Sequence, residues 1–469
     1  MDWNKRYTDI SICFALSILL FHMLFFPSYI MPLPILFTGV GIIVFFFLGV
    51  YAYNKSWKHQ PHFKQSIFMH SLLYRLLGVL GMYWLTMLYD PANLPLEISA
   101  SDSWNYHYSG VIVANAIHGG DDIFEKLSYF WKSEADYGFS ILIGTLYSFL
   151  GKNILVIKIF NALIGAFTVV RIYQITAFAY DEKRARLAGI ITMLMPPLLW
   201  FGGIFLKETV LIFLIVNTAY YTTKIINQSR FLLLYVLIIL CHFGVVFYFR
   251  TILAPLLFCC VLMQLVFYKT KKKRYRFFSG LITAIFIAGS IYVVNTLSMD
   301  KHLEPLIEAS KNQFGTELST ASKNRGITYA AALIAPLLIV GAIITPFPSV
   351  LDFEEAQLGI YAHYQNEIIR NSLYFFVFLG LYRAVKLRNR ETIFILSFSI
   401  IYIVILAISG ISFQDRFQIL SLPFLIVFMS DGIIADHKRK KQQWILYLGF
   451  IFLAIFMWNV FKLSNRGLL

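Results

Sequence analysis

The sequence contains few cysteines and none of the common nucleotide-binding motifs. Its four cysteines, Cys13, Cys241, Cys259 and Cys260, all stand in apolar segments and lack the paired spacing of metal ligands. We therefore expect neither a disulfide framework nor a zinc site. No G-x-G-x-x-G or Walker sequence is present, which argues against an ATP-driven transporter. Repeats of fixed period and low-complexity linkers are also missing, so we expect one integral-membrane domain over 1–469.

Long apolar runs dominate what is present. Hydrophobic residues make up 58% of the 469 positions, charged residues make up 14%, and the mean hydropathy is +0.68. A run of about 20 apolar residues can cross the ~30 Å of hydrocarbon in a bilayer. The runs predict an all-α polytopic membrane protein with about 13 transmembrane helices. They lie near 8–27, 30–53, 69–90, 154–180, 186–206, 208–225, 231–249, 251–268, 277–298, 367–385, 392–411, 417–435 and 443–462.

The basic residues indicate which loops face the cytoplasm. Seven groups hold more than half of the 40 Lys and Arg, and they alternate with loops of little charge. Loops rich in Lys and Arg are typical of the cytoplasmic side, so we predict the amino terminus inside and the carboxy terminus outside. Topology then explains most of the net charge of +15, and we expect no nucleic-acid partner. The groups are Lys5-Arg6, Lys55/Lys58/Lys64, Lys183/Arg184/Arg186, Lys224/Arg230, Lys269 to Arg276, Lys386/Arg388/Arg390 and Lys438-Arg439-Lys440-Lys441.

This topology puts a polar insert, 91–153, on the outer face as the first large outer loop. Its apolar stretch Gly138–Leu150 is too short to cross a bilayer, and Ala330–Thr345 would begin and end outside if it crossed. We expect short interfacial helices in the insert. We also expect a re-entrant or interfacial segment in a second outer region, 299–366. Both features favour an outer site covered by partly buried loops.

Asp102 is the first candidate for chemistry in the insert. It precedes Trp104, Tyr106 and Tyr108. Such a pattern is typical of an interfacial loop with an aromatic belt and a helix-capping aspartate. A general base flanked by rings that stack on a sugar or a lipid uses the same residue types. Four further carboxylates are candidates for a second acid or a metal ligand, although a solvated surface also explains each one singly: Asp121, Asp122, Glu134 and Asp136.

Three cations stand in very short outer turns: Lys207, Arg250 and Arg416. A cation at the edge of a bilayer commonly extends toward lipid phosphates. Three cations at the same edge also fit an anion site, in which they would neutralise a phosphate or diphosphate. Glu208, next to Lys207, would hold that lysine in place or simply pair with it.

Several stretches occur in a characteristic order after the acidic start of the insert. They are Asp136 to Tyr147, Phe149 to Asn153, Lys158 to Gly165, Tyr180 to Ala188, Met195-Pro196-Pro197, Phe205 to Glu208 and Asp415 to Pro423. This order resembles the GT-C superfamily of integral-membrane glycosyltransferases, which includes protein O-mannosyltransferases, oligosaccharyltransferases and lipid A aminoarabinose transferases. The resemblance covers roughly 70–250 and, more weakly, the last 60 residues.

The resemblance implies a reaction and roles for particular residues. Members transfer a sugar from a polyprenyl- or dolichyl-phosphate carrier on the non-cytoplasmic face, and their catalytic acid lies in the first large outer loop. Asp102 matches that position and would deprotonate or orient the acceptor hydroxyl while the anomeric carbon inverts. Further roles are also implied: phosphate binding for Lys207, Arg250 and Arg416, and substrate contact for Trp104, Tyr106, Tyr108 and Glu208. Some members bind a divalent cation such as Mg²⁺ or Mn²⁺ and others do not, so metal use stays open.

The implied partners are a polyprenyl-phosphate-linked sugar, a glycan or lipid-linked acceptor, and membrane lipids. The implied location is the bacterial inner membrane, with the active site on the periplasmic face. Two features depart from the common pattern: two spans precede the one that leads into the catalytic loop, and no soluble outer domain follows the last span. The second departure argues against folded-protein acceptors and favours surface polysaccharide or lipid-glycan assembly.

Two other functions use similar features. A polysaccharide polymerase or ligase with a diphosphate carrier would share the outer cations and carboxylate. A transporter or flippase of lipid-linked glycans should show repeat symmetry and ionisable residues at mid-span. The ionisable residues here crowd the outer edge, while the spans carry almost no charge, and this favours an enzyme.

Overall fold

The computed structural model describes residues 3–89, 94–96, 101–227, 231–268, 344, 347–351, 358–408 and 415–464. Every named element within these ranges is a helix, which confirms the expected all-α class. The chain packs as two compact units. Unit 1 comprises 1–47 and 262–469, and unit 2 comprises 48–261. The prediction of one integrated domain stays a prediction.

Nine helices among the described residues are long and apolar enough to cross a membrane, so the chain is a polytopic membrane protein. They match nine of the expected spans. These helices are α1 (Lys5–Phe25), α2 (Leu33–Ser56), α3 (Phe63–Tyr89), α7 (Ile154–Ala179), α10 (Glu208–Asn227), α11 (Leu232–Phe249), α16 (Leu358–Lys386), α17 (Ile393–Ile408, preceded by η3, Arg390–Thr392) and α20 (Lys440–Ser464).

Of the other four expected spans, one is bent, two are shorter than expected and one lies outside the described residues. The span at 186–206 is a pair of helices, α8 (Glu182–Leu194) and α9 (Pro196–Gly203), bent by 50°. Consecutive prolines at the start of α9 remove two backbone donors, which explains the bend. Two apolar helices are shorter than expected, α12 (Leu253–Phe267) and α19 (Leu422–Ile434). The span at 277–298 lies outside the described residues.

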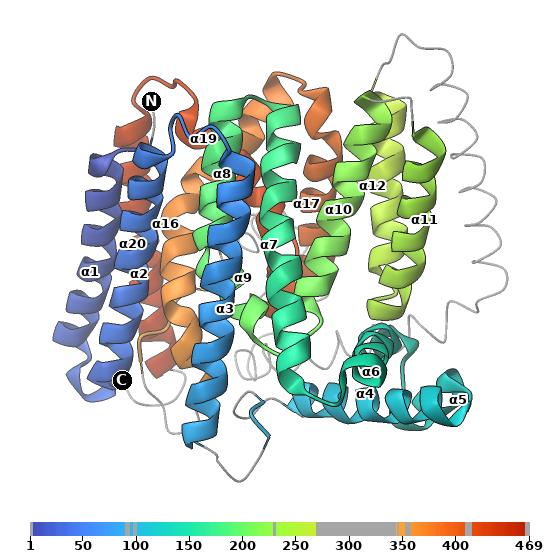
Figure 1. The fold of residues 1–469 in the computed structure, drawn as a ribbon. Coiled ribbons are helices and arrows are strands. Elements are labelled where there is room, and N and C mark those ends of the chain that lie inside the picture. The colour runs from blue at the N-terminus through green and yellow to red at the C-terminus, as the bar shows by residue number, and fades with distance from the viewer. Residues whose placement is uncertain are drawn as a thin grey trace, which may run out of the picture. The chain divides into compact units, whose positions relative to one another are not determined.

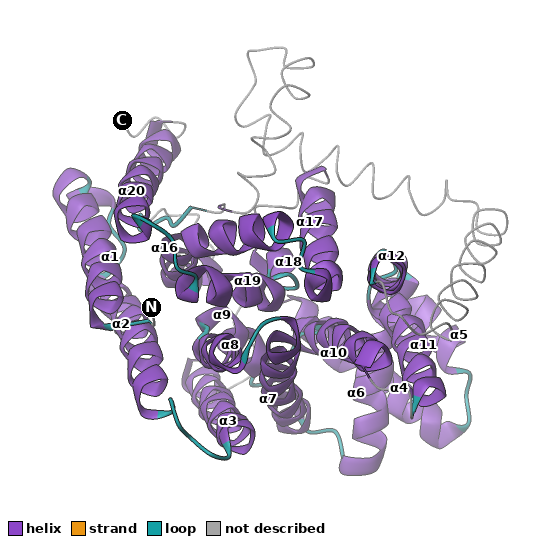
Figure 2. Cartoon of the chain, turned by 90° about the horizontal axis from the view of Figure 1, so that it is seen from above, coloured by secondary structure: helices purple, strands orange, loops and turns teal. Residues whose placement is uncertain are grey.

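The insert of unit 2 folds into helices of 3 to 19 residues, and their place at a membrane interface stays a prediction. They are α4 (Ser101–Gly119), α5 (Ile123–Phe130), the single turn η2 (Glu134–Asp136) and α6 (Tyr137–Leu150). Figure 1 shows α4 and α5 lying crosswise at one end of α7, α10 and α11. In Figure 2, α7 is seen nearly along its axis, whereas α6 runs across the view. The insert is therefore a layer at one end of the long helices of unit 2.

Close packing of α4 against α6 fixes this layer. A Cβ atom added at Gly144 would lie 2.9 Å from the carbonyl oxygen of Gly110 and 2.3 Å from Cγ1 of Val113. Only glycine permits this approach of the two helices. Ser109 of α4 and Ser140 of α6 add a hydrogen bond of 2.7 Å between their buried hydroxyls. The position of α4 thus depends on α6.

The long helices of unit 2 separate its basic loops from the insert. At one end, Nη1 of Arg186 donates hydrogen bonds to the carbonyl oxygens of Trp57 (2.8 Å) and Lys58 (3.4 Å). At the other end, Nζ of Lys207 donates to the carbonyl oxygen of Ala135 in the insert (3.1 Å). The charge pattern predicted this separation. Which side faces the cytoplasm stays a prediction.

Unit 1 contains two neighbouring helices that begin with basic residues and run in the same direction. The rings of Tyr7 and Trp444 lie 5.1 Å apart near the starts of α1 and α20, and those of Phe21 and Phe456 also lie 5.1 Å apart further along. In the same unit, α16 and α19 pack backbone to backbone, since a Cβ at Gly380 would lie 2.0 Å from the carbonyl oxygen of Phe428.

The second outer region, 299–366, falls mostly outside the described residues. From Leu358 onward it forms the start of α16. The expected re-entrant segment Ala330–Thr345 also lies outside them, apart from residue 344.

Candidate functional site

Charged and phenolic side chains meet in unit 2 where the insert packs against the ends of the long helices. We call Tyr106, Asp136, Lys207, Glu208 and Arg250 the junction cluster. Tyr106 comes from α4, Asp136 ends η2, and Lys207 and Glu208 stand at the start of α10. Arg250 caps the carboxyl end of α11. Five residues spread over about 145 positions of sequence thus come from one end of unit 2.

Asp136 holds the insert side of the junction cluster together. Its Oδ1 accepts a hydrogen bond from the Tyr106 hydroxyl at 2.7 Å and another from Nζ of Lys207. The Lys207 ammonium also lies 5.6 Å from the centre of the Tyr106 ring, within range of a cation–π interaction. The side chain of Lys207 is 6% exposed and that of Asp136 is 27% exposed. Lys207 and Asp136 therefore form a largely buried ion pair.

The surroundings of Lys207 act on its pKa in opposite directions. Burial lowers the pKa most, the Asp136 carboxylate raises it, the Arg250 guanidinium lowers it and Glu208 raises it. The net effect is a pKa below the usual lysine value. Desolvation therefore outweighs the two carboxylates, as expected for a cation removed from water.

Glu208 and Arg250 form the second charged pair. Nη2 of Arg250 lies 3.8 Å from Oε1 of Glu208, whose side chain is fully buried. Each cation of the junction cluster therefore has a carboxylate from the same unit. Asp136 and Glu208 thus already supply negative charge to these two cations, and phosphate binding by Lys207 and Arg250 stays a prediction.

The loop that carries Lys207 is hydrogen-bonded to a side chain of α7. Nδ2 of the buried Asn161, on α7, donates to the carbonyl oxygens of Ile204 and Leu206, both at 3.3 Å. These carbonyls follow the end of α9 and belong to no helix, so a side-chain donor is needed to satisfy them. Asn161 thus fixes the backbone on which Lys207 is mounted.

Asp102 lies in the first turn of α4 and is half-buried. Residues four apart on a helix share one face, with Cβ atoms about 5–6 Å apart, so Asp102 lies on the same face as Tyr106. Trp104 and Tyr108 occupy the opposite face, where their rings stack at 5.9 Å. Of the three predicted aromatic contacts, only Tyr106 joins the junction cluster.

The other predicted carboxylates have local roles. Asp122 caps α5 by accepting bonds from the backbone N–H groups of Phe124 and Glu125. Asp121 pairs with Lys126 at 3.4 Å on the surface, and Glu134 is exposed. Within the described ranges, no three His, Cys, Asp or Glu side chains gather as metal ligands do. Of these four candidate carboxylates, Asp136 is the one that contacts Lys207.

Arg416 belongs to unit 1, where it lies in the short helix α18 (Asp415–Gln418) and is half-buried. Its grouping with Lys207 and Arg250 stays a prediction.

Arg75, a buried arginine near the middle of α3, is not among the predicted site residues. Its Nη1 donates to the carbonyl and hydroxyl oxygens of Ser71, one turn earlier. Its side chain fills the space beside Gly165, where a Cβ would lie 2.6 Å from Nε. Among the described residues, no carboxylate pairs with it. Arg75 is thus an ionisable side chain within a span, in a sequence whose spans otherwise carry almost no charge.

A histidine on the buried side of α4, His107, is also absent from the predicted site residues. Nδ1 of His107 lies 2.9 Å from the hydroxyl of Tyr147 on α6, and burial lowers the pKa of the imidazole. A helical reading of Asp102–Tyr108 could have identified His107, which directly follows Tyr106 in α4.

No protein family, no curated protein and no solved structure matches this chain. The GT-C resemblance therefore stays a prediction that rests on the order of the sequence stretches.

Proposed function

We propose that this chain is an integral-membrane glycosyltransferase of GT-C type. It would transfer a sugar from a polyprenyl-phosphate carrier to a lipid-linked or glycan acceptor, in surface polysaccharide or lipid-glycan assembly. The junction cluster is the observation that carries this proposal. In this cluster the insert contributes Tyr106 and Asp136, and the ends of the long helices contribute the buried Lys207 and the half-buried Arg250.

The proposed reaction divides its tasks between Asp102 and the cations. The acceptor oxygen forms a bond to the anomeric carbon, and the bond from that carbon to the phosphate oxygen breaks. The phosphate leaves with the electron pair, and the hydroxyl proton passes to the Asp102 carboxylate. Lys207 and Arg250 would stabilise the charge that develops on the phosphate. Because a lipid phosphate is already a good leaving group, no protonating acid is required.

The proposal includes 13 spans, a location in the bacterial inner membrane and a site on the periplasmic face. The nine described spans, the bent pair α8–α9 and the two short apolar helices support this arrangement. The separation of basic loops from the insert in unit 2 supports the sidedness. A divalent cation is not required for any step of the proposed reaction.

A second candidate function is transport of a lipid-linked glycan. Arg75 favours it, because ionisable residues at mid-span mark substrate pathways in many transporters. The bent pair α8–α9 also favours it, since broken helices occur in transporter binding sites.

One pair of assays separates the two functions. Protein reconstituted in liposomes is given a panel of polyprenyl-phosphate hexoses with a glycolipid extract as acceptor, and release of polyprenyl phosphate is measured. We expect Asp102→Asn to reduce turnover by ~10²–10⁴-fold, because the amide keeps the size of the side chain but cannot accept the proton. Asp121→Asn, which changes an exposed carboxylate of the same insert, is the matched control and should retain activity.

The second assay follows movement of a fluorescent polyprenyl-phosphate lipid between leaflets. If the chain is a transferase, the unchanged protein and Arg75→Leu should both show only the background rate of lipid movement. Full turnover by Asp102→Asn, together with lipid movement that depends on Arg75, would replace the transferase proposal with the transporter. If Asp102→Asn is active while Asp136→Asn is inactive but folded, Asp136 is the base instead.

A further inference from the structure

A cavity of about 590 Å³ lies within unit 1, between the ends of α12, α16 and α17. This volume is within the ~300–1,000 Å³ typical of ligand sites. Its walls are mostly aliphatic and aromatic, and they include Met263, Val266 and Phe267 of α12 and Ile393, Leu396 and Ile401 from the start of α17 onward. Because α17 is a membrane span, this apolar cavity, which we also call the groove, is suited to a hydrocarbon chain.

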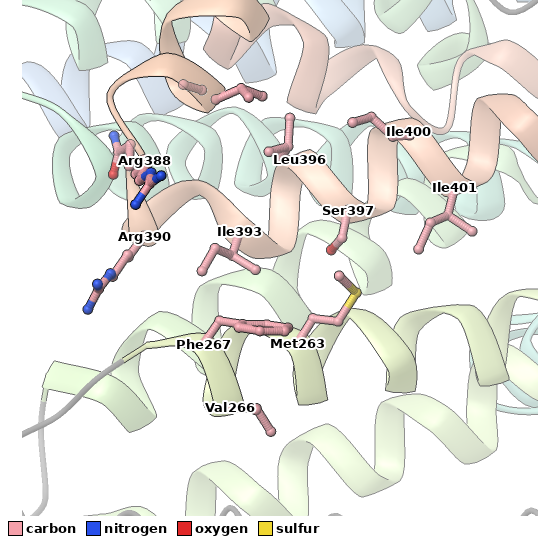
Figure 3. Close-up of a pocket in the computed structure, with 13 residues that line it drawn as sticks. Met263, Val266, Phe267, Arg388, Arg390, Ile393, Leu396, Ser397, Ile400 and Ile401 are labelled. Carbon is pink, nitrogen blue, oxygen red and sulfur yellow. The ribbon is translucent and has the colours of Figure 1, made fainter.

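The cavity is charged at one end only. Figure 3 shows Arg388 and Arg390 at the same end, whereas Ile401 lies at the other. Both arginines are exposed, and among the described residues no carboxylate pairs with either. The groove therefore has the charge distribution of a receptor for an amphiphile, with a cationic end for an anionic head and an apolar length for a tail.

Arg388 adopts a backbone conformation that arginine rarely takes. Its φ is +49°, and it follows the last turn of α16. The N–H groups of Arg388 and Asn389 bond to the carbonyls of Val385 (3.1 Å) and Ala384 (3.0 Å), which is the pattern of a Schellman helix end. Glycine is the usual residue at this position because it has no Cβ penalty. Arg388 therefore lines the cavity from a backbone conformation that is costly for a residue with a Cβ atom.

The arginine-bearing segment is also held rigidly. The buried side chain of Gln264, on α12, donates through Nε2 to the carbonyl oxygen of Arg390 (2.9 Å) and accepts through Oε1 from the N–H of Phe394 (2.7 Å). The start of the η3 turn and the first turn of α17 are thus both tied to α12, on the opposite wall of the groove. A preformed site of this kind loses little conformational entropy when a ligand binds.

We propose that this groove binds one anionic glycerophospholipid, with its phosphate on Arg388 and Arg390 and an acyl chain along α12 and α17. The lipid would come from the leaflet at the basic end of the unit, where Lys and Arg are concentrated near anionic headgroups. The site lies entirely within unit 1 and does not depend on the proposed transferase activity.

The test uses the full-length protein in nanodiscs of phosphatidylcholine with graded phosphatidylglycerol, and native mass spectrometry counts the retained lipids. We expect one phosphatidylglycerol to stay bound at low mole fraction, and we expect Arg388→Ala with Arg390→Ala to weaken its retention about tenfold or more. Arg439→Ala with Lys441→Ala is the matched control. It removes the same charge from exposed residues of unit 1, and Arg439 also has a positive φ (60°), but neither residue lines the cavity.

A second variant tests the apolar part of the groove. Ser397→Leu places a larger side chain in the cavity without changing the charge of the cavity. It should also weaken retention of phosphatidylglycerol. Inorganic phosphate should fail to displace the lipid, because the tail contributes to binding. Three results would overturn the proposal: equal loss in the control pair, full displacement by phosphate, or a photocrosslinker at position 401 that captures a peptide of this chain in place of lipid.

Discussion

Lys207 donates a hydrogen bond to the carboxylate of Asp136, although 71 positions separate the two residues. The bond joins the insert to the start of α10, and the lysine end of it is buried. Removing one partner of a buried ion pair leaves a charge that water cannot stabilise. The attachment of the insert to the long helices of unit 2 therefore depends on this charge pair as well as on packing.

Asp136→Asn should lower the free energy of unfolding by about 2–4 kcal/mol, because Lys207 would stay buried without its carboxylate partner. Thermal unfolding in detergent measures the effect. Asp121→Asn is the control, since its pair with Lys126 has side chains that are 53% and 46% exposed. Exposed pairs contribute only about 0–1 kcal/mol. Equal destabilisation by the two changes would contradict the role given to Asp136.

Acid should destabilise the protein partly through His107, whose pKa burial lowers below the usual 6.5. Between the folded pKa and 6.5 the unfolded chain binds more protons, so the free energy of unfolding falls as pH falls through this window. His107→Gln should flatten this part of the pH dependence measured by thermal unfolding. His118→Gln, at the exposed end of the same helix, should leave it unchanged. An unaltered profile in His107→Gln would mean that this imidazole does not titrate there.

Cysteine labelling tests the predicted sidedness of unit 2. In a background with the four native cysteines replaced by serine, Tyr129→Cys places a thiol on the exposed surface of α5, and Lys183→Cys places one in a basic loop. A membrane-impermeant maleimide should label position 129 in intact cells and position 183 only after permeabilisation. The reverse pattern would put the insert in the cytoplasm and remove the basis for a periplasmic active site.

Gly380→Ala should destabilise unit 1 by about 1–3 kcal/mol, because the added methyl group would collide with the carbonyl oxygen of Phe428. The measurement is again thermal unfolding. Gly449→Ala is the control, since no atom lies within 4 Å of a Cβ at this position on α20. Alanine is a better helix former than glycine, so the control should be neutral or slightly stabilising. A tolerated Gly380→Ala would show that α16 and α19 separate more easily than their backbone contact implies.

Apolar runs predicted most helices but could not predict how each one is buried. All 13 residues of α19 are buried among other parts of the protein, so its hydrophobicity reflects internal packing as much as contact with lipid. A helix buried in protein and a helix in contact with lipid are both rich in apolar residues. The apolar run at 417–435 was therefore read as a full span, although α19 covers only Leu422–Ile434. A single charge does not interrupt a long apolar run, and Arg75 was overlooked for that reason.

The candidate site was predicted residue by residue and not as a set of contacts. Asp136 and Lys207 were both candidates, but their pairing depends on how η2 packs against the start of α10, and no local pattern encodes that. The split of Tyr106 from Trp104 and Tyr108 was predictable, because residues two apart lie on opposite faces of a helix. The three aromatic residues were nevertheless predicted together as substrate contacts.

The junction cluster contains two cations and two carboxylates, so it supplies its own counter-ions. An anionic ligand that binds Lys207 must compete with Asp136, and binding is then an exchange of one anion for another. The exchange would release the Asp136 carboxylate from its lysine and leave it free to accept a proton or another cation. Ligand entry and the release of the Asp136 carboxylate from Lys207 would thus be a single coupled event.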